Sequence, residues 1–144
     1  MAPLKKTSIT IAPALEKFLA RYNTSSRESN VTASGLIGNM AERYMRLLAD
    51  GKRSRPKFSE KEMEYLYVMV IHGEVDPDSP VRLAAQLEFW IPQDLEAQDM
   101  DEFSSSQVPD TWKDMLKRLN TLSLAQELSL IEEFEAKASK NRDN

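Results

Sequence analysis

The chain of 144 residues contains no cysteine, one histidine and only four glycines. Without cysteine it can form neither a disulfide framework nor a thiolate metal site, and it offers no thiol nucleophile. No apolar run approaches the roughly 20 residues that span a bilayer, and the lysines near the N-terminus precede no apolar signal-peptide core. We therefore expect a soluble, cytoplasmic protein that makes no membrane contact.

Patterns for catalysis and cofactor binding are equally scarce. His72 ends an apolar segment, where a core or capping role is several times commoner than a catalytic one. The stretch Asp76-Pro77-Asp78 lacks the glycine and the spaced third ligand of a calcium loop. There is neither a phosphate-binding glycine loop nor a nucleophile motif. We expect no enzyme activity, no metal site and no cofactor.

Positive charge is concentrated in the first part of the chain. Residues 1–57 hold eleven Lys and Arg against four Asp and Glu, a net charge of +7, whereas the remainder holds eight bases and nineteen acids, a net charge of −11. This separation predicts that the basic part meets a polyanion and that the acidic part faces water or another protein. The alternative is that the charges simply cover two solvated faces.

Residues 6–11 alternate between polar and apolar side chains, as a β-strand does. No second strand is predicted nearby, and an unpaired strand leaves its backbone donors and acceptors without partners. We therefore expect the same strand of a second copy to pair with it, which gives an obligate dimer with a two-stranded ribbon. The apolar face holds Ile9 and Ile11, and the polar face holds Lys6, Ser8 and Thr10.

Two amphipathic helices are predicted after the strand. Pro13 suits the first turn of a helix, and apolar residues recur at helical spacing up to residue 22. Thr32 suits the N-cap of the second helix, and Gly51 suits the position just after its end. The sequence therefore predicts one helix over residues 13–22 and another that ends before residue 51.

The second predicted helix contains two glycines, Gly35 and Gly38, about one turn apart. Each costs roughly 1 kcal/mol relative to alanine inside a helix. A dimer-related helix or a DNA phosphate that approaches the backbone closely would explain them. The alternative is that the helix merely tolerates the two glycines and that neither has a role.

A basic segment at residues 52–57 divides the chain, and Pro56 within it opposes a continuous helix. We interpret it as a linker between a domain of residues 1–51 and a helical, acidic domain of residues 58–144. The linker either follows DNA phosphates or is merely flexible and solvated.

The acidic domain is predicted to be helical throughout. Ser79 and Pro80 are expected to restart a helix that Pro92 breaks or restarts, and the tail after Ala138 is expected to fray. Phe89, Trp90 and Trp112 are expected to pack in a helical core, and stacking on bases is the alternative. Three further helix starts are marked by Ser59 with Glu62, by Asp110, and by Ser123 with Gln126.

The first fifty residues resemble the ribbon-helix-helix family of DNA-binding proteins (MetJ/Arc/CopG type). The resemblance rests on Ser8-Ile9-Thr10-Ile11, on Ala14-Leu15-Glu16-Lys17-Phe18-Leu19 and on the helix opening at residues 30–37, and it covers about a third of the chain. It implies a mainly α fold class: an N-terminal ribbon-helix-helix, with one β-strand shared in a dimer and two helices, followed by the all-helical acidic C-terminal domain.

In that family the outward strand residues contact base edges, the start of the second helix holds a phosphate, and inward residues form a shared core. The alternative for the outward strand residues is a solvated strand face. The alternative for Thr32 at the start of the second helix is a helix cap that touches no ligand. The longer loop between the helices would add a backbone contact. The resemblance implies base contacts by Lys6, Ser8 and Thr10, phosphate contacts by Lys5, Arg27, Thr32, Ala33 and Ser34, and a dimer core of Ile9, Ile11, Leu15, Phe18, Leu36, Ile37, Met40 and Tyr44.

The resemblance thus implies a sequence-specific protein that binds double-stranded DNA in the nucleoid as a homodimer and represses transcription of its own or a neighbouring operon. Assembly on adjacent sites and a protein partner for residues 58–144 would extend this role. The alternative is an antitoxin, or a plasmid partition or relaxosome accessory protein, in which the acidic helical domain binds a partner protein. A small helical enzyme is the least supported hypothesis.

Overall fold

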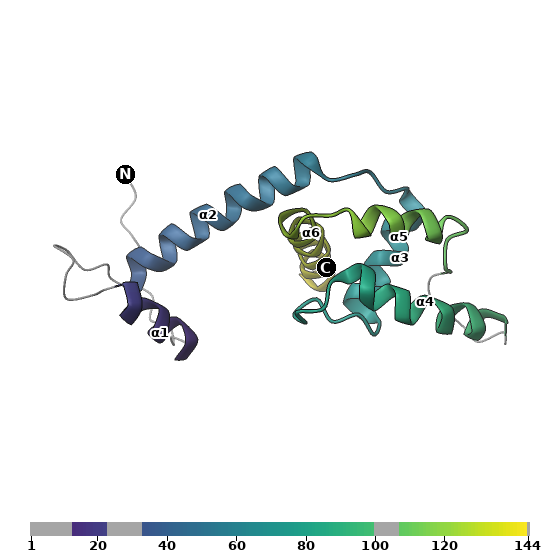
Figure 1. Cartoon of the computed structure of the whole chain (residues 1–144), viewed down its shortest axis with the longest axis horizontal. Coiled ribbons are helices and arrows are strands. Elements are labelled where there is room, and N and C mark those ends of the chain that lie inside the picture. Colours follow the sequence, from purple (N-terminus) through teal and green to yellow (C-terminus); the bar gives the residue numbers. More distant parts are fainter. Residues whose placement is uncertain (1–12, 23–32, 100–106, 144) are drawn as a thin grey trace. The chain divides into compact units, whose positions relative to one another are not determined.

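The computed structural model of the chain describes residues 13–22, 33–99 and 107–143. Every regular element in these ranges is a helix and none is a strand (Figure 1). The expected fold class, in which a shared β-strand precedes the helices, is therefore wrong, because the described chain is all-helical. The predicted strand at residues 6–11 lies outside the described ranges. Alternation over so short a segment separates a strand from other structures only weakly.

The chain divides into two compact units, Met1–Tyr44 and Met45–Asn144. Helix α1 (Pro13–Tyr22) and the first part of α2 (Ala33–Ser54) belong to the first unit, and all later helices belong to the second. Figure 1 shows α2 as one unbroken helix. The division therefore falls within a helix and not in a loop.

Helix α1 forms where the apolar spacing predicts it. Pro13 is its first residue, where the missing N–H removes no helical hydrogen bond. Glu16 lies in its first turn, near the positive end of the helix dipole, and Arg21 lies in its last turn, near the negative end, so both charges stabilise the helix. The prediction of a helix over residues 13–22 is confirmed.

Helix α2 is longer than predicted. It continues through Gly51 to Ser54, so the expectation that Gly51 ends it is wrong. A Cβ atom at residue 51 would lie 2.6 Å from the carbonyl carbon of Ala125 in α6 (Leu124–Asp143). Glycine is therefore required here because two helices approach each other closely. The first residues of the predicted linker are helical as a consequence.

Helix α3 (Glu60–Tyr67) begins with the predicted capping box. The Glu62 N–H donates to Ser59 Oγ at 3.2 Å, and the Ser59 N–H donates to Glu62 Oε1 at 2.8 Å. The chain continues into a π-helical turn, η1 (Val68–His72), which stops at Gly73 as expected. A Cβ atom at residue 73 would lie 2.9 Å from the Met69 Cα. Glycine thus lets the chain leave the helix beside its own last turn.

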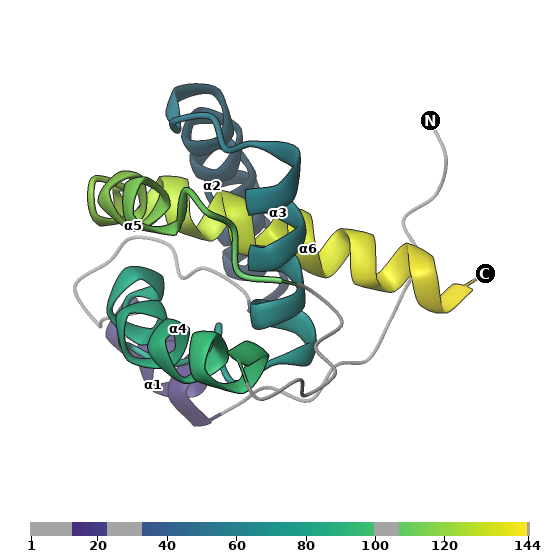
Figure 2. The same ribbon diagram turned by 90° about the vertical axis from the view of Figure 1, so that its right-hand side faces the viewer.

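Three more helices complete the second unit: α4 (Leu83–Asp99), α5 (Trp112–Asn120) and α6. Helix α4 packs against α5, and α6 packs against η1 (Figure 2). The predicted capping box at the start of α6 is confirmed, because the Ser123 N–H donates to Gln126 Oε1 at 2.9 Å and the Gln126 N–H donates to Ser123 Oγ at 3.2 Å.

The limits of α4 differ from the prediction. The helix begins at Leu83, because Ser79 Oγ accepts the Val81 N–H at 3.1 Å and holds the preceding residues in a turn. Pro92 lies inside α4 and does not break it. A proline removes one helical hydrogen bond, but Ile91 before it is buried and Leu95 after it packs against the core, and these contacts hold both parts of the helix in place.

The starts and ends of the last helices also differ. Thr111 and not Asp110 occupies the N-cap of α5, and its side chain makes no capping hydrogen bond. The tail beyond Ala138 stays helical to Asp143. Asn141 contributes to this, because its side-chain amide donates to the Tyr67 hydroxyl at 3.3 Å. Tertiary contact therefore outweighs the fraying that an isolated helix end shows.

The core of the second unit encloses Tyr65, whose hydroxyl donates to Asp94 Oδ2 at 2.8 Å. Burial, and then this hydrogen bond, raise the pKa of Tyr65 well above its ordinary value. Trp90 and Trp112 pack against the core as expected, whereas Phe89 is 62% exposed and does not. The most deeply buried apolar side chains of the core are Leu66, Leu87, Ile91, Met115 and Leu130.

Candidate functional site

Helix α2 carries a row of exposed apolar side chains. Met40, Tyr44 and Leu47 recur at helical spacing on one side of the helix and are 41%, 36% and 43% exposed. Ile37 extends the row and is half-buried, whereas Leu36 is buried. A group of large apolar side chains on a surface is typical of a site that another protein covers.

Helix α2 also carries exposed basic side chains. Arg43 and Arg46 are exposed, and Arg53 forms an exposed ion pair with Asp50. The first turn of the helix contains no acidic residue, and Ser34 there is exposed. Because the N–H groups of a first helical turn carry partial positive charge, this end of α2 suits an anion.

The structure describes only part of the predicted DNA and dimer site. Ala33 begins α2 and Ser34 follows it, so these two predicted phosphate contacts lie together at a helix start. Leu15 and Phe18 belong to α1. Four predicted dimer-core residues, Leu36, Ile37, Met40 and Tyr44, belong to α2. The other predicted residues, Lys5, Lys6, Ser8, Ile9, Thr10, Ile11, Arg27 and Thr32, lie outside the described ranges.

Gly38 faces open space. Apart from its own helix, no atom of the described residues lies within 4 Å of the place where a Cβ would stand. Packing inside the described chain therefore does not require this glycine. The close approach of a second molecule to Gly38 stays a prediction. The alternative, that the helix merely tolerates a glycine here, stays one as well.

The segment that the sequence suggests as a flexible linker is held by hydrogen bonds. The Arg55 side chain is 11% exposed, its Nη1 donates to Ser129 Oγ at 3.2 Å, and its Nη2 pairs with Glu133. Arg118 Nη1 donates to the Lys57 carbonyl oxygen at 2.9 Å. The sequence left two alternatives for this segment. A flexible, solvated linker is wrong at Arg55, because its side chain is bonded to Ser129 and Glu133 of α6.

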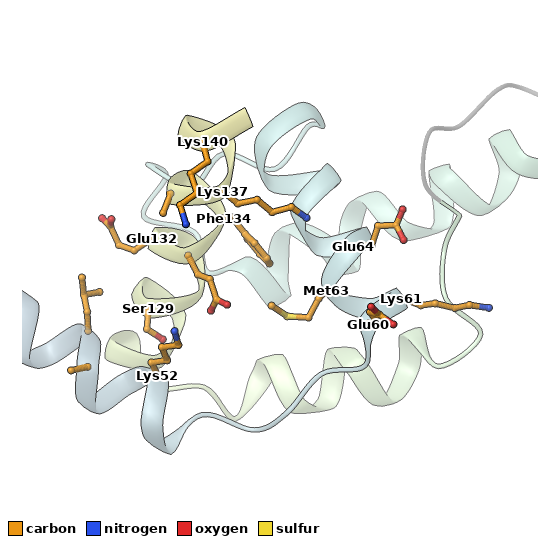
Figure 3. Close-up of a pocket in the computed structure, with 14 residues that line it drawn as sticks. Lys52, Glu60, Lys61, Met63, Glu64, Ser129, Glu132, Phe134, Lys137 and Lys140 are labelled. Atoms are coloured by element: carbon orange, nitrogen blue, oxygen red, sulfur yellow. The ribbon is translucent and has the colours of Figure 1, made fainter. Parts of the chain in front are cut away.

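A groove of about 1000 Å³ lies between the end of α2, α3 and α6 (Figure 3). Met63 of α3, which is half-buried, and Phe134 of α6, which is 2% exposed and belongs to the core, are the large apolar side chains of its lining. Eight of its fourteen lining residues are exposed. The groove is therefore an open surface feature and not an enclosed cavity.

Four lysines and four glutamates line the groove. Lys137 places its Nζ 4.2 Å from the centre of the Tyr67 ring, and Glu133 is occupied by Arg55. Lys52 and Lys140 form no ion pair with any residue that the structure describes. These two ammonium groups are therefore available to a ligand.

Glu62 is 2% exposed and is bonded on both carboxylate oxygens. Arg118 Nη1 and Nη2 donate at 2.9 and 2.5 Å, and Thr111 Oγ1 donates at 3.0 Å. Burial alone raises the pKa of Glu62, but the hydrogen bonds from Arg118, from the Ser59 N–H and from Thr111 outweigh it and lower the pKa to about 2. The capping box predicts only the Ser59 contact, and nothing local indicates Arg118.

Glu127 is the second buried carboxylate with an arginine partner. It pairs with Arg82, and it accepts the N–H of Leu83, the first residue of α4, at 2.7 Å. Arg82 Nη2 also donates to the Leu122 carbonyl oxygen at 2.7 Å. Glu127 therefore satisfies a free N–H at the start of α4 from a distant helix.

A reactive centre is not found among the described residues. His72 is exposed and contacts the Tyr67 ring edge to face, with 5.8 Å between the ring centres. No group of three or more potential metal ligands occurs in the described ranges. No helix among them has the length and apolar character needed to cross a membrane.

Comparison of the chain with models of protein families, with curated proteins and with solved structures finds no match. The function must therefore be argued from the surfaces themselves. Two of these stand out in the described chain: the exposed surface of α2, which carries the apolar row and exposed arginines, and the groove beside Lys52 and Lys140.

Proposed function

We propose that the chain is a DNA-binding protein that acts as a homodimer and represses transcription. The observation that carries this proposal is the concentration of positive charge in residues 1–57, eleven bases against four acids. Such a segment gains affinity for DNA when phosphates exchange their counterions for Lys and Arg. The remainder, at −11, is repelled by DNA, so that contact is confined to one part of the chain.

The surface of α2 supports the DNA contact. Arg43 and Arg46 are exposed, and the first turn of α2 holds no acidic residue that would repel a phosphate from the positive end of the helix dipole. Ser34, exposed in that turn, adds a hydroxyl donor. Positive side chains along α2 and a helix start of this kind both favour the DNA backbone over a neutral ligand.

The apolar row of Met40, Tyr44 and Leu47 supports the homodimer. Burying a side chain of this size gains roughly 1.5–3 kcal/mol, so a surface that covers the row is favoured in water. In a symmetric dimer the same patch on each copy covers the other. The row on α2 is suited to this, because it lies along one helix and pairs with itself without further elements.

The proposal does not include a β-ribbon, because the described residues are helical. Base contacts by Lys6, Ser8 and Thr10 stay a prediction for residues outside the described ranges. Phosphate contact and dimer formation both rest on residues whose charge or exposure is established above.

The proposal is tested with the full-length protein and a fluorescent duplex of about 30 base pairs taken from a site mapped in the source genome. Affinity should fall steeply as salt rises, and Lys5→Glu with Lys6→Glu should weaken binding by about tenfold or more. A matched pair in the acidic part, Lys113→Glu with Lys117→Glu on α5, should leave it unchanged. Equal losses in both pairs, or affinity insensitive to salt, would contradict the proposal.

A further inference from the structure

We propose that the exposed side of α4 binds a basic, arginine-bearing segment of a partner protein. The opposite side of α4 belongs to the core, so this is the free side of a helix at the edge of the second unit (Figure 1). The inference goes beyond DNA binding and dimer formation and rests on none of the residues used for them. The outward face of α4 consists of exposed residues at helical spacing: Ala85, Glu88, Phe89, Pro92, Gln93 and Glu96.

Phe89 is the apolar centre of the outward face. It is 62% exposed, so most of an aromatic ring lies in water. The ring contacts Trp90 edge to face, with 4.9 Å between the ring centres, and Trp90 in turn packs against the core. The exposed ring is therefore held in place, and a ligand does not have to order it on binding. Aromatic side chains of this kind are enriched at protein interfaces.

Every charged side chain on the outward face is acidic. Glu88 and Glu96 form no ion pair with any residue that the structure describes, the lysines of the neighbouring α5 included. Residues 83–112 contain seven Asp and Glu and no Lys or Arg. The face therefore attracts a cation, and the net charge of −11 of residues 58–144 strengthens this attraction at a distance. The same charge repels a nucleic acid.

Pro92 adds a third acceptor to the two carboxylates. A proline has no N–H, so the carbonyl oxygen of Glu88, one turn earlier, lacks the donor that residue 92 supplies in an ordinary helix. Both residues are exposed, which leaves this oxygen open to a donor from another molecule. The ligand that satisfies two carboxylates and this carbonyl must supply N–H donors and positive charge.

Arginine matches these groups better than lysine does. Its planar guanidinium can stack on the Phe89 ring and donate several N–H groups to Glu88 at the same time, whereas a lysine ammonium is a compact point charge. Glu88 and Glu96 are eight residues apart, which is about 12 Å along the helix axis. An extended segment advances about 3.3 Å per residue, so arginines four positions apart would reach both carboxylates.

The test uses the full-length protein and a fluorescein-labelled peptide of about 12 residues, in which arginines recur at every fourth position with leucines between them. Fluorescence anisotropy should show saturable binding that weakens as the salt concentration rises. A matched peptide with lysines in place of the arginines should bind about threefold more weakly or worse, and one with glutamates should not bind.

Variants of the acidic residues test the charge. Glu88→Gln with Glu96→Gln should raise the Kd of the arginine peptide by about tenfold, because both carboxylates that attract it are neutralised. Glu60→Gln with Glu64→Gln is the matched control, since it makes the same change of charge at exposed positions of α3, and it should leave the Kd unchanged. Equal losses in the two pairs would show attraction to the acidic unit as a whole and would overturn the proposal.

Phe89→Ala tests the aromatic contact. It should raise the Kd of the arginine peptide by about fivefold and reduce its advantage over the lysine peptide, because the ring that favours a guanidinium is removed. Circular dichroism should show an unchanged helix content, since Phe89 lies outside the core. Loss of DNA binding in this variant would overturn the proposal by making the face a nucleic-acid contact. A change from dimer to monomer would do so by making a second copy the occupant.

Pro92→Ala separates binding from folding. Alanine supplies the missing N–H to the Glu88 carbonyl, so the melting temperature should rise while the arginine peptide binds about threefold more weakly. An unchanged Kd in this variant would contradict the role of the carbonyl. Absence of binding by the arginine peptide, or equal binding of the arginine and glutamate peptides, would overturn the proposal as a whole.

Discussion

Glu62 and Arg118 form a buried ion pair that joins α3 to α5 through hydrogen bonds of 2.9 and 2.5 Å. Both carboxylate oxygens have a further partner, since Oε1 accepts the Ser59 N–H at 2.8 Å and Oε2 accepts the Thr111 hydroxyl at 3.0 Å. Each carboxylate oxygen of Glu62 therefore accepts two hydrogen bonds, one of them from the cationic Arg118, although the residue is 2% exposed. Loss of either partner would leave an uncompensated charge in the fold.

Glu62→Gln is expected to lower the free energy of unfolding by about 3 kcal/mol, because Arg118 would keep its charge without a carboxylate. Urea denaturation followed by circular dichroism measures this difference. Glu60→Gln is the matched control, since Glu60 is exposed in the same helical turn, and it should change stability by less than about 0.5 kcal/mol. Similar losses in the two variants would contradict the role of the ion pair.

Stability should fall in acid because of the same residue. The pKa of Glu62 is lowered from 4.5 to about 2 in the folded protein, so its carboxylate stabilises the fold above about pH 4.5. This contribution, about 3 kcal/mol, is lost as the pH falls from 4.5 through 2. Urea titrations between pH 7 and 2 should show the difference between wild type and Glu62→Gln shrinking over this interval. A difference that is constant with pH would rule out the linkage.

Gly51→Ala and Gly38→Ala should have opposite effects although both lie in α2. Alanine at residue 51 would overlap the Ala125 carbonyl group, so we expect a loss of about 2 kcal/mol or more. Alanine at residue 38 meets open space and should gain about 0.5–1 kcal/mol from its helix propensity. Thermal unfolding of both variants gives the comparison. Stabilisation by Gly51→Ala would show that α2 and α6 are not in close contact there.

Met40→Glu with Leu47→Glu should convert the proposed dimer into a monomer, because a shared interface would have to bury two unpaired carboxylates. Sedimentation velocity should then give the mass of one chain, 16.4 kDa, instead of twice that value. Met45→Glu is the control, since Met45 is 68% exposed on another side of α2. If the double variant remained a dimer, the apolar row would not be the interface.

Local signals in the sequence predict local structure well in this chain. The capping boxes of Ser59 with Glu62 and of Ser123 with Gln126 form as expected, because each needs only residues three positions apart. Pro13 likewise begins α1. Such patterns involve neighbours along the chain, so periodicity and residue type are sufficient to find them.

Contacts between distant segments are where the sequence is misleading. Gly51 has the spacing of a helix end, but its role is set by Ala125, and Arg55 has the composition of a linker, but it binds Ser129. Arg118 carries no sign of its contact with Glu62. The exposed row on α2 was predictable as an apolar face, whereas the groove was not, because three separate helices build it.

Gly51 has a consequence for how other chains of this kind can be found. From Gly51 the contacts of the second unit follow at fixed intervals, with Arg55 four residues on, Ser59 four more and Glu62 three more. Each position is restricted for its own physical reason: a missing side chain, a partly buried cation, a cap and a buried anion. A chain that folds in the same way is therefore expected to keep the pattern G-x3-R-x3-S-x2-E, with an arginine to pair with the glutamate and a glutamate to pair with the arginine.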